Sequence, residues 1–168
     1  MQVTIKGMEE LFAEMDKFQM NIPQALANAG RVAMKPTILG PAKMMCPVDT
    51  GHLQTSIHTE SNTTTTGAFV RTGTNYFYAV YVEFGTGKYA KNGGGRQTPW
   101  GYIYEGHKGK AGLRFTHGNK PQPFLTTAFE LNKDRIPDLI ARSLRMQIDN
   151  AVRKKRLAAV SEYLGGME

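Results

Sequence analysis

The sequence predicts an α+β protein in which a small antiparallel sheet packs against N-terminal helices and a long C-terminal helix. Apolar residues recur at helical spacing near both ends of the chain, and short alternating stretches lie between them. A basic, Gly-rich segment separates the sheet from the last helix. We expect a single domain, with N-terminal helices in 1–46, a turn and hairpin region in 47–87, an extended basic loop in 88–120 and a C-terminal helical segment in 121–168.

Two helices are expected in the N-terminal region. The first has apolar side chains at helical spacing, namely Met8, Leu11, Phe12, Met15 and Phe18. Asn21 can cap the second, because Pro23 is tolerated in a first turn. The apolar face of this second helix consists of Ile22, Ala25, Leu26, Ala29, Val32 and Ala33. Pro36 and the Gly40-Pro41 pair are expected to kink or break it.

The central region changes to alternation, which predicts a hairpin of two short strands in 57–73 around a Thr-rich tip at 63–66. Residues 75–85 mix strand-forming side chains with a helical face, and Gly85 stands where a helix C-cap would, so we expect a short helix. Residues 85–121 form a longer loop than compact domains usually contain, which indicates binding or ordering on assembly. Strands are expected near 101–104 and 112–116.

The C-terminal segment carries one long helical face. Its apolar residues are Phe124, Leu125, Ala128, Phe129, Ile136, Ile140, Leu144, Ile148 and Val152. Pro123 fits a first turn, and Pro137 either kinks the helix or starts a second one.

The net charge of +7 is unevenly distributed. Residues 88–129 hold seven Lys or Arg against Glu105 alone, and a second basic run lies at 153–156. Such patches attract phosphate backbones and acidic protein surfaces alike, so a basic DNA-binding accessory protein is one candidate function. The candidate partner or DNA contacts are Lys88, Lys91, Arg96, Lys108, Lys110, Arg114, Lys120, Arg153, Lys154, Lys155 and Arg156.

The single cysteine, Cys46, excludes an internal disulfide and suits a reducing compartment. We expect it to be a buried, unreactive thiol. The N-terminus lacks the pattern of a signal peptide, and no apolar run approaches the roughly 20 residues that span a bilayer, so we expect a soluble intracellular protein without a membrane partner. The lone cysteine and the four scattered histidines lack paired ligand spacing, so no metal or other cofactor is expected.

Asp49-Thr50-Gly51 has the form of an aspartic protease loop. That chemistry needs an apolar strand before the aspartate and a second carboxylate beside it, and only a homodimer of this chain could supply the second. A homodimeric protease is therefore a remote alternative. We expect instead that Asp49 or Thr50 caps the helical turn that follows. Gly85-Thr86-Gly87-Lys88 fits neither a P-loop nor a dinucleotide-binding turn.

Three segments in order carry a family resemblance: 47–57 (PVDTGHLQTSI), 78–88 (YAVYVEFGTGK) and 120–130 (KPQPFLTTAFE). Over roughly residues 5 to 145 the chain resembles the tail completion, or head-tail joining, proteins of long-tailed bacteriophages and prophages. The motif residues are Asp49, Thr50, Gly51, Leu53, Ser56, Ile57, Tyr78, Ala79, Glu83, Gly85, Thr86, Pro123, Phe124 and Leu125.

The resemblance implies a non-enzymatic structural protein of the virion, in the tail or neck, that assembles in the host cytoplasm. It further implies a homo-oligomeric ring, hexameric in the family, that contacts neck or adaptor proteins and tail tube or tail terminator proteins, with genome DNA as a further partner inside the ring. Leu53 and Ile57 are expected in the core. Glu83, a lone acid on an apolar segment, is a candidate intersubunit group, because a buried carboxylate needs a partner.

Overall fold

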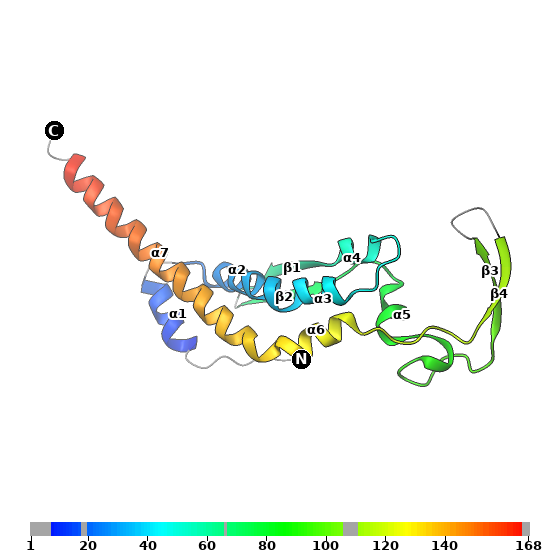
Figure 1. Ribbon diagram of the computed structural model, residues 1–168. Coiled ribbons are helices and arrows are strands. Elements are labelled where there is room, and N and C mark those ends of the chain that lie inside the picture. The colour runs from blue at the N-terminus through cyan, green and yellow to red at the C-terminus, as the bar shows by residue number, and fades with distance from the viewer. Residues whose placement is uncertain (1–7, 18–19, 66, 106–110, 166–168) are drawn as a thin grey trace. The chain divides into compact units, whose positions relative to one another are not determined.

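The computed structural model describes residues 8–17, 20–65, 67–105 and 111–165 (Figure 1). The chain divides into two compact units. The first comprises Met1–Gly40, Thr59–Thr72 and Leu131–Glu168, and the second comprises Pro41–His58 and Gly73–Glu130. The predicted α+β class and the long C-terminal helix are confirmed, and the strands form two separate two-stranded sheets.

The first unit is built on three helices, α1 (Met8–Lys17), α2 (Ile22–Met34) and α7 (Ile136–Gly165). Its core consists of Leu11, Met15, Ala25, Ala29, Leu144 and Ile148. Small alanines on α2 let the long helix α7 approach closely, and the Gln147 side chain of α7 donates a hydrogen bond to the Ala25 carbonyl oxygen at 3.1 Å. The predicted helices are confirmed, and so are their core faces apart from Val32, while the Met8 side chain and Phe18 lie outside the described residues.

The second helix begins at the predicted cap, but the helical chain continues past Pro36. The Asn21 side chain accepts a hydrogen bond from the Gln24 backbone N–H at 3.0 Å. Of the two expected outcomes at Pro36, a kink or a break, the break is not found, because a π-helical turn, η1 (Lys35–Leu39), leads directly into α3 (Gly40–Met45). A π turn accommodates a residue without an N–H inside a continuous helix. The prediction for Val32 was also wrong, since its side chain is 53% exposed.

The predicted hairpin is confirmed as β1 (His58–Thr63) and β2 (Ala68–Gly73). Arg71 and Glu60 pair across the strands, with the Arg71 Nε to Glu60 Oε2 distance at 2.9 Å. The hairpin packs directly on α2 at Gly30, where a Cβ atom would lie only 2.5 Å from the Val70 Cγ2 atom. A glycine at this position therefore permits the strand to contact the helix backbone.

This contact predicts that Gly30→Ala lowers the free energy of unfolding by roughly 1–3 kcal/mol, because overpacking forces a side chain or the backbone to shift. Val70→Ala removes the group that the new methyl meets. The double variant Gly30→Ala with Val70→Ala should therefore be more stable than the sum of the two single effects predicts, as measured by urea unfolding followed by circular dichroism. Strictly additive effects would contradict the contact.

The C-terminal segment is two helices. α6 (Phe124–Asn132) is followed by a 3-10 turn, η3 (Lys133–Arg135), and by α7, whose first turn contains Pro137. Pro137 therefore starts a second helix, where its missing N–H is harmless. From Arg153 to Ser161 every side chain of α7 is exposed. Within the described ranges, no helix is both long and apolar enough to cross a membrane.

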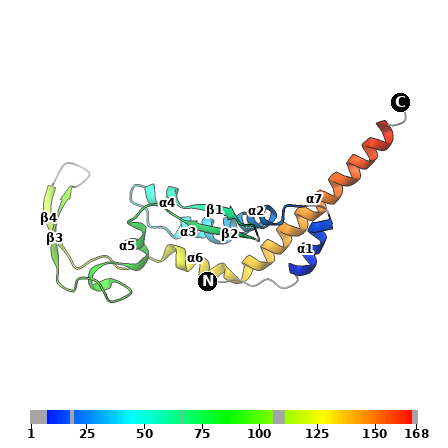
Figure 2. The ribbon, with the colours of Figure 1, turned by 180° about the vertical axis from the view of Figure 1, so that it is seen from behind.

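The second unit holds the short helices α4 (His52–Ser56) and α5 (Ala79–Phe84), a 3-10 turn, η2 (Gly87–Tyr89), and a hairpin of β3 (Trp100–Glu105) and β4 (Ala111–Thr116). The predicted short helix and both predicted strands are confirmed. The expected long basic loop over 88–120 is not found, because η2 and the β3–β4 hairpin occupy much of it. Figure 2 shows the same elements from behind.

Candidate assembly surface

The three motif segments meet in the second unit. Residues from all three line one cavity of about 770 Å³, including Asp49 from the first, Val82 from the second and Gln122 from the third. Leu53 and Ile57 are buried, as expected, and Ala79 and Phe124 are buried as well. Segments far apart in the sequence thus form one local framework.

Glu83 fastens the second motif to the third. Its carboxylate is only 5% exposed and accepts two backbone hydrogen bonds, from Leu125 N–H to Oε2 at 3.0 Å and from Thr126 N–H to Oε1 at 2.8 Å. These N–H groups belong to the first turn of α6, where backbone donors lack helical partners and the helix dipole favours negative charge. Glu83 therefore has its partner within the chain, and the expectation of an intersubunit partner was wrong.

The backbone beside Glu83 runs unusually close to the segment before α6. The Thr86 N–H donates to the Asn119 carbonyl oxygen at 2.9 Å, and the Lys88 N–H donates to the His117 carbonyl oxygen at 3.0 Å. A Cβ at Gly87 would overlap the His117 carbonyl, and Gly87 has a positive φ of 59°. The glycines here are needed for this close approach.

The Asp49-Thr50-Gly51 turn differs from its prediction. Gly51, with φ at 81°, is the residue that precedes α4, and no side chain caps the helix. The predicted cap by Asp49 or Thr50 was wrong, because Gly51 supplies the left-handed conformation and its carbonyl oxygen accepts the Thr55 N–H at 3.0 Å. Asp49 and Thr50 are both exposed. An exposed aspartate lacks the buried setting in which proteases pair two carboxylates.

Ser56 connects the end of α4 to the chain after β2. Its hydroxyl lies 2.6 Å from the Thr74 hydroxyl and donates to the Leu53 carbonyl oxygen at 2.7 Å. In the same unit, Gln54 donates to the Lys43 carbonyl oxygen at 2.8 Å. Ser56 and Gln54 thus connect the first motif to the chain after β2 and to α3.

Cys46 is buried, as predicted. Burial raises the pKa of its thiol above the ordinary value, and the negative charge of Glu83 adds to this shift. Both effects lower the thiolate fraction at neutral pH. Among the described residues, no cluster of three His, Cys, Asp or Glu side chains could hold a metal ion.

The Cys46 environment predicts slow alkylation. The native protein should react with iodoacetamide at least about tenfold more slowly than the urea-unfolded chain, because only the exposed thiolate is nucleophilic. Raising the pH toward the elevated pKa should increase the native rate. Mass spectrometry of quenched samples measures both rates, and equal rates in folded and unfolded protein would contradict the burial.

Helix α5 presents aromatic side chains to solvent. Phe77, just before the helix, is 78% exposed, and Val80, Tyr81 and Phe84 are each about half exposed. Phe77 and Tyr81 stack edge to face with ring centroids 6.5 Å apart. A run of exposed apolar residues of this kind marks an interaction site. The signal in the sequence for this exposed surface is the helical spacing of Phe77, Tyr81 and Phe84, which indicates a second apolar face besides the buried one.

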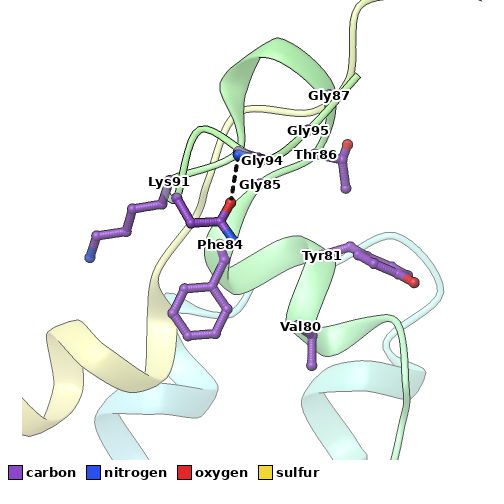
Figure 3. Close-up of a pocket in the computed structure, with 11 residues that line it drawn as sticks. Val80, Tyr81, Phe84, Gly85, Thr86, Gly87, Lys91, Gly94 and Gly95 are labelled. Atoms are coloured by element: carbon purple, nitrogen blue, oxygen red, sulfur yellow. Dashed lines mark hydrogen bonds between the residues drawn. The ribbon is translucent and has the colours of Figure 1, made fainter. Parts of the chain in front are cut away.

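Beside α5 lies a cavity of about 620 Å³, here called the α5 pocket (Figure 3). Val80, Tyr81 and Phe84 line one side, and the glycine-rich backbone of residues 85–95 lines the other. The Lys91 N–H closes this loop by donating to the Phe84 carbonyl oxygen at 2.9 Å. The pocket is therefore apolar on its helix side and has backbone on its loop side.

The described residues among the predicted basic contacts are exposed. On the second unit, Lys88, Lys91, Arg96, Arg114 and Lys120 are exposed, and on α7 of the first unit Arg153, Lys154, Lys155 and Arg156 are exposed. Lys108 and Lys110 lie outside the described residues. Arg114 lies over the Tyr104 ring at 4.1 Å, and Arg96 lies 5.9 Å from the Trp100 ring.

Comparison with known proteins supplies one match. Residues 4–85 match the HK97-gp10-like family, whose description reads "Bacteriophage HK97-gp10, putative tail-component". Residues 4–85 are thus similar to a bacteriophage tail-component family. This HK97-gp10-like segment contains the first motif and the second as far as Gly85, so the resemblance drawn from the motifs is confirmed. No curated protein and no solved structure matches.

The HK97-gp10-like match supports a structural role in a phage tail, and therefore a place in the virion and contacts with other tail or neck proteins. A structural family also favours a protein without catalysis. The matched segment ends just after the α5 helix, and the β3–β4 hairpin and α7 follow it in the sequence.

Proposed function

We propose that this chain is a tail completion or neck subunit that joins the filled head to the tail during virion assembly. The observation that supports this most is the exposed apolar surface at α5 in the second unit, which lies within the segment that matches a phage tail family. Large exposed apolar patches mark contacts with other proteins. A subunit that acts by assembly requires such surfaces and needs no catalytic centre.

The assembled form is proposed to be a closed ring of identical copies, six as the resemblance implies. A ring forms when one surface of a copy binds a different surface of the next copy and the rotation closes. Neck or adaptor proteins would bind one end of the ring, and tail tube or terminator proteins the other. Genome DNA would pass through its centre.

The motif residues act in this proposal as a fixed framework. Asp49, Thr50, Gly51 and Ser56 build the turn at α4, and Tyr78 with Thr86 borders the junction that Glu83 closes. Pro123, Phe124 and Leu125 begin α6 at that junction. None of these residues is proposed to react with a substrate. Their role is to present α5 and the β3–β4 hairpin to neighbouring subunits.

Removal of the hairpin tests the proposal. A variant in which a short Gly-Ser linker replaces residues 100–116 should stay folded, because the backbone pairing of Thr86 and Lys88 with 117–119 is kept. We expect it to fail to complement a phage that lacks the gene, with at least about a hundredfold fewer plaques than the wild-type chain. Shortening the β1–β2 tip at 63–65 is the matched control. Full complementation by the hairpin variant would contradict the proposal.

DNA binding is the second candidate, and one face of the hairpin favours it. Tyr102, Tyr104 and Arg114 lie on that face, exposed, and such residues can stack bases and neutralise phosphates. This function predicts binding to arbitrary DNA that weakens steeply with salt, with a shallower salt dependence for Arg114→Gln. Weak DNA binding that is unaffected by this substitution would count against it.

A further inference from the structure

The loop that lines the α5 pocket contains an asparagine followed by a glycine, Asn92-Gly93. Asn92 is the only asparagine in the sequence that precedes a glycine, and it is itself one of the residues that line the pocket. Both residues are exposed to solvent. Asparagine is a thermolabile residue, because a neighbouring backbone nitrogen can displace its side-chain amide. The pair is therefore a candidate site of spontaneous covalent modification.

Gly93 leaves its backbone nitrogen open to react. A glycine has no Cβ atom, so its own residue does not shield the nitrogen, and its backbone rotates more freely than that of any other residue. Gly93 has a positive φ of 69°, and nothing lies within 4 Å of the position where a Cβ would be. The nitrogen can therefore be approached by the side chain of the preceding residue.

The Asn92 side chain folds back over this peptide. Its Oδ1 atom accepts a hydrogen bond from the Gly94 backbone N–H at 3.3 Å. The ring that this bond closes contains both reacting atoms, the Cγ atom of Asn92 and the backbone nitrogen of Gly93. The bond also draws electron density away from Cγ, which favours nucleophilic attack at that atom. The turn thus keeps the electrophile near the nucleophile.

One hydrogen bond opposes the reaction. The Gly93 N–H donates to the Ala90 carbonyl oxygen at 2.9 Å, and the nitrogen must lose this proton before it attacks. Exposed turns open locally at little cost in free energy, so this bond is broken in a fraction of the molecules at any time. We therefore expect the bond to slow the reaction without preventing it.

We propose that Asn92 of the native chain deamidates spontaneously through a succinimide. Hydroxide takes the proton of the Gly93 nitrogen, which forms a bond to the Asn92 Cγ atom. The Cγ–Nδ2 bond then breaks, and the leaving nitrogen takes a proton from water and departs as ammonia, which regenerates the hydroxide. Water opens the succinimide ring at Cγ to give aspartate, or at the backbone carbonyl carbon to give isoaspartate. No atom is oxidised or reduced, and water is the only co-reactant.

The modification changes the wall of the α5 pocket. Among the described residues that line the pocket, Lys91 alone is charged, so a carboxylate at position 92 cancels the net positive charge of the wall. Isoaspartate also routes the backbone through Cβ and lengthens the loop, which the Lys91 N–H ties to the Phe84 carbonyl oxygen at 2.9 Å. The pocket therefore alters in charge and in shape as the chain ages.

Peptide mapping of the purified full-length chain tests the site. The chain is incubated at neutral and at mildly alkaline pH, and mass spectrometry follows the Asn92 and Asn62 peptides over time. Asn62 is the matched internal control, because it is exposed as well but precedes the β-branched Thr63. We expect Asn92 to convert at least about tenfold faster than Asn62, since a glycine leaves the nitrogen open and a β-branched residue shields it. The rate should rise with pH, and isoaspartate should be among the products.

Two variants test the mechanism. Gly93→Ala places a methyl group beside the nucleophile and should slow conversion at Asn92 to the rate at Asn62. Asn92→Gln keeps an exposed amide but would have to close a larger ring, so its side chain should remain intact over the same period. Because Asn92→Gln leaves Gly93 in place, it also serves if Gly93→Ala distorts the loop.

Three results would overturn the proposal. The first is equal conversion of Asn92 and Asn62 in the native chain. The second is conversion of Asn92 only after unfolding in urea, which would mean that the hydrogen bond to Ala90 protects the site. The third is an unchanged rate in Gly93→Ala, which would exclude the Gly93 nitrogen as the nucleophile. All three are measured on the purified chain, so they are independent of its proposed role in the virion.

Discussion

Glu83→Ala is expected to lower the free energy of unfolding by roughly 2–4 kcal/mol, because it leaves two buried N–H groups of α6 without acceptors. The carboxylate accepts from Leu125 and Thr126 at 3.0 and 2.8 Å and lies at the positive end of the helix dipole. Trp100 lies in the same unit, so its fluorescence in a urea titration follows the transition.

Two further variants separate charge from hydrogen bonding at this position. Glu83→Gln keeps one oxygen acceptor and loses the charge, so we expect an intermediate loss of about 1–2 kcal/mol. Glu14→Ala removes an exposed carboxylate of α1 and should change stability by less than about 0.5 kcal/mol. If Glu83→Ala were as mild as Glu14→Ala, the proposed fastening of α6 by Glu83 would be wrong.

Gly87→Ala is expected to be strongly destabilising. The new methyl group would overlap the His117 carbonyl and approach the Trp100 ring to 2.9 Å, at a residue whose φ is 59°. The backbone cannot move aside as a flexible side chain can, so we expect the free energy of unfolding to fall by more than about 2 kcal/mol. The same fluorescence titration measures it, and the altered Trp100 contact should also shift the emission maximum.

Gly51→Ala is the matched control for this prediction. Gly51 also has a positive φ, at 81°, but nothing lies within 4 Å of where its Cβ would be. Gly51→Ala should therefore lower the free energy of unfolding only by the cost of the left-handed backbone conformation, about 1–2 kcal/mol. Equal losses for the two variants would mean that the close approach of 86–88 to 117–119 contributes nothing.

Local sequence signals predicted the elements well. The Asn21 cap, the Leu144 and Ile148 face and the short helix ending at Gly85 follow from capping, periodicity and glycine placement, which involve neighbours in the chain. The structure confirms all three. Pro36 does not break the helix, one of the two outcomes expected for it, because a π turn accommodates its missing N–H without ending the helix.

Contacts between residues far apart in the sequence could not be predicted from local patterns. That Glu83 needed a partner was evident from its apolar surroundings, but residues about forty positions away supply it, and nothing in spacing identifies them. The prediction of a side-chain cap at α4 was wrong because Gly51, which has no side chain to accept a hydrogen bond, occupies the N-cap position. The α5 pocket arises only when the loop of 85–95 folds back on the helix.

The central claim is that this chain is a structural subunit that joins phage heads to tails. Electron microscopy of a lysate from a phage with the gene disrupted tests it most directly. The claim predicts filled heads and separate tails that become joined, infectious particles when the purified chain is added. Normally joined particles in the absence of the chain would contradict it.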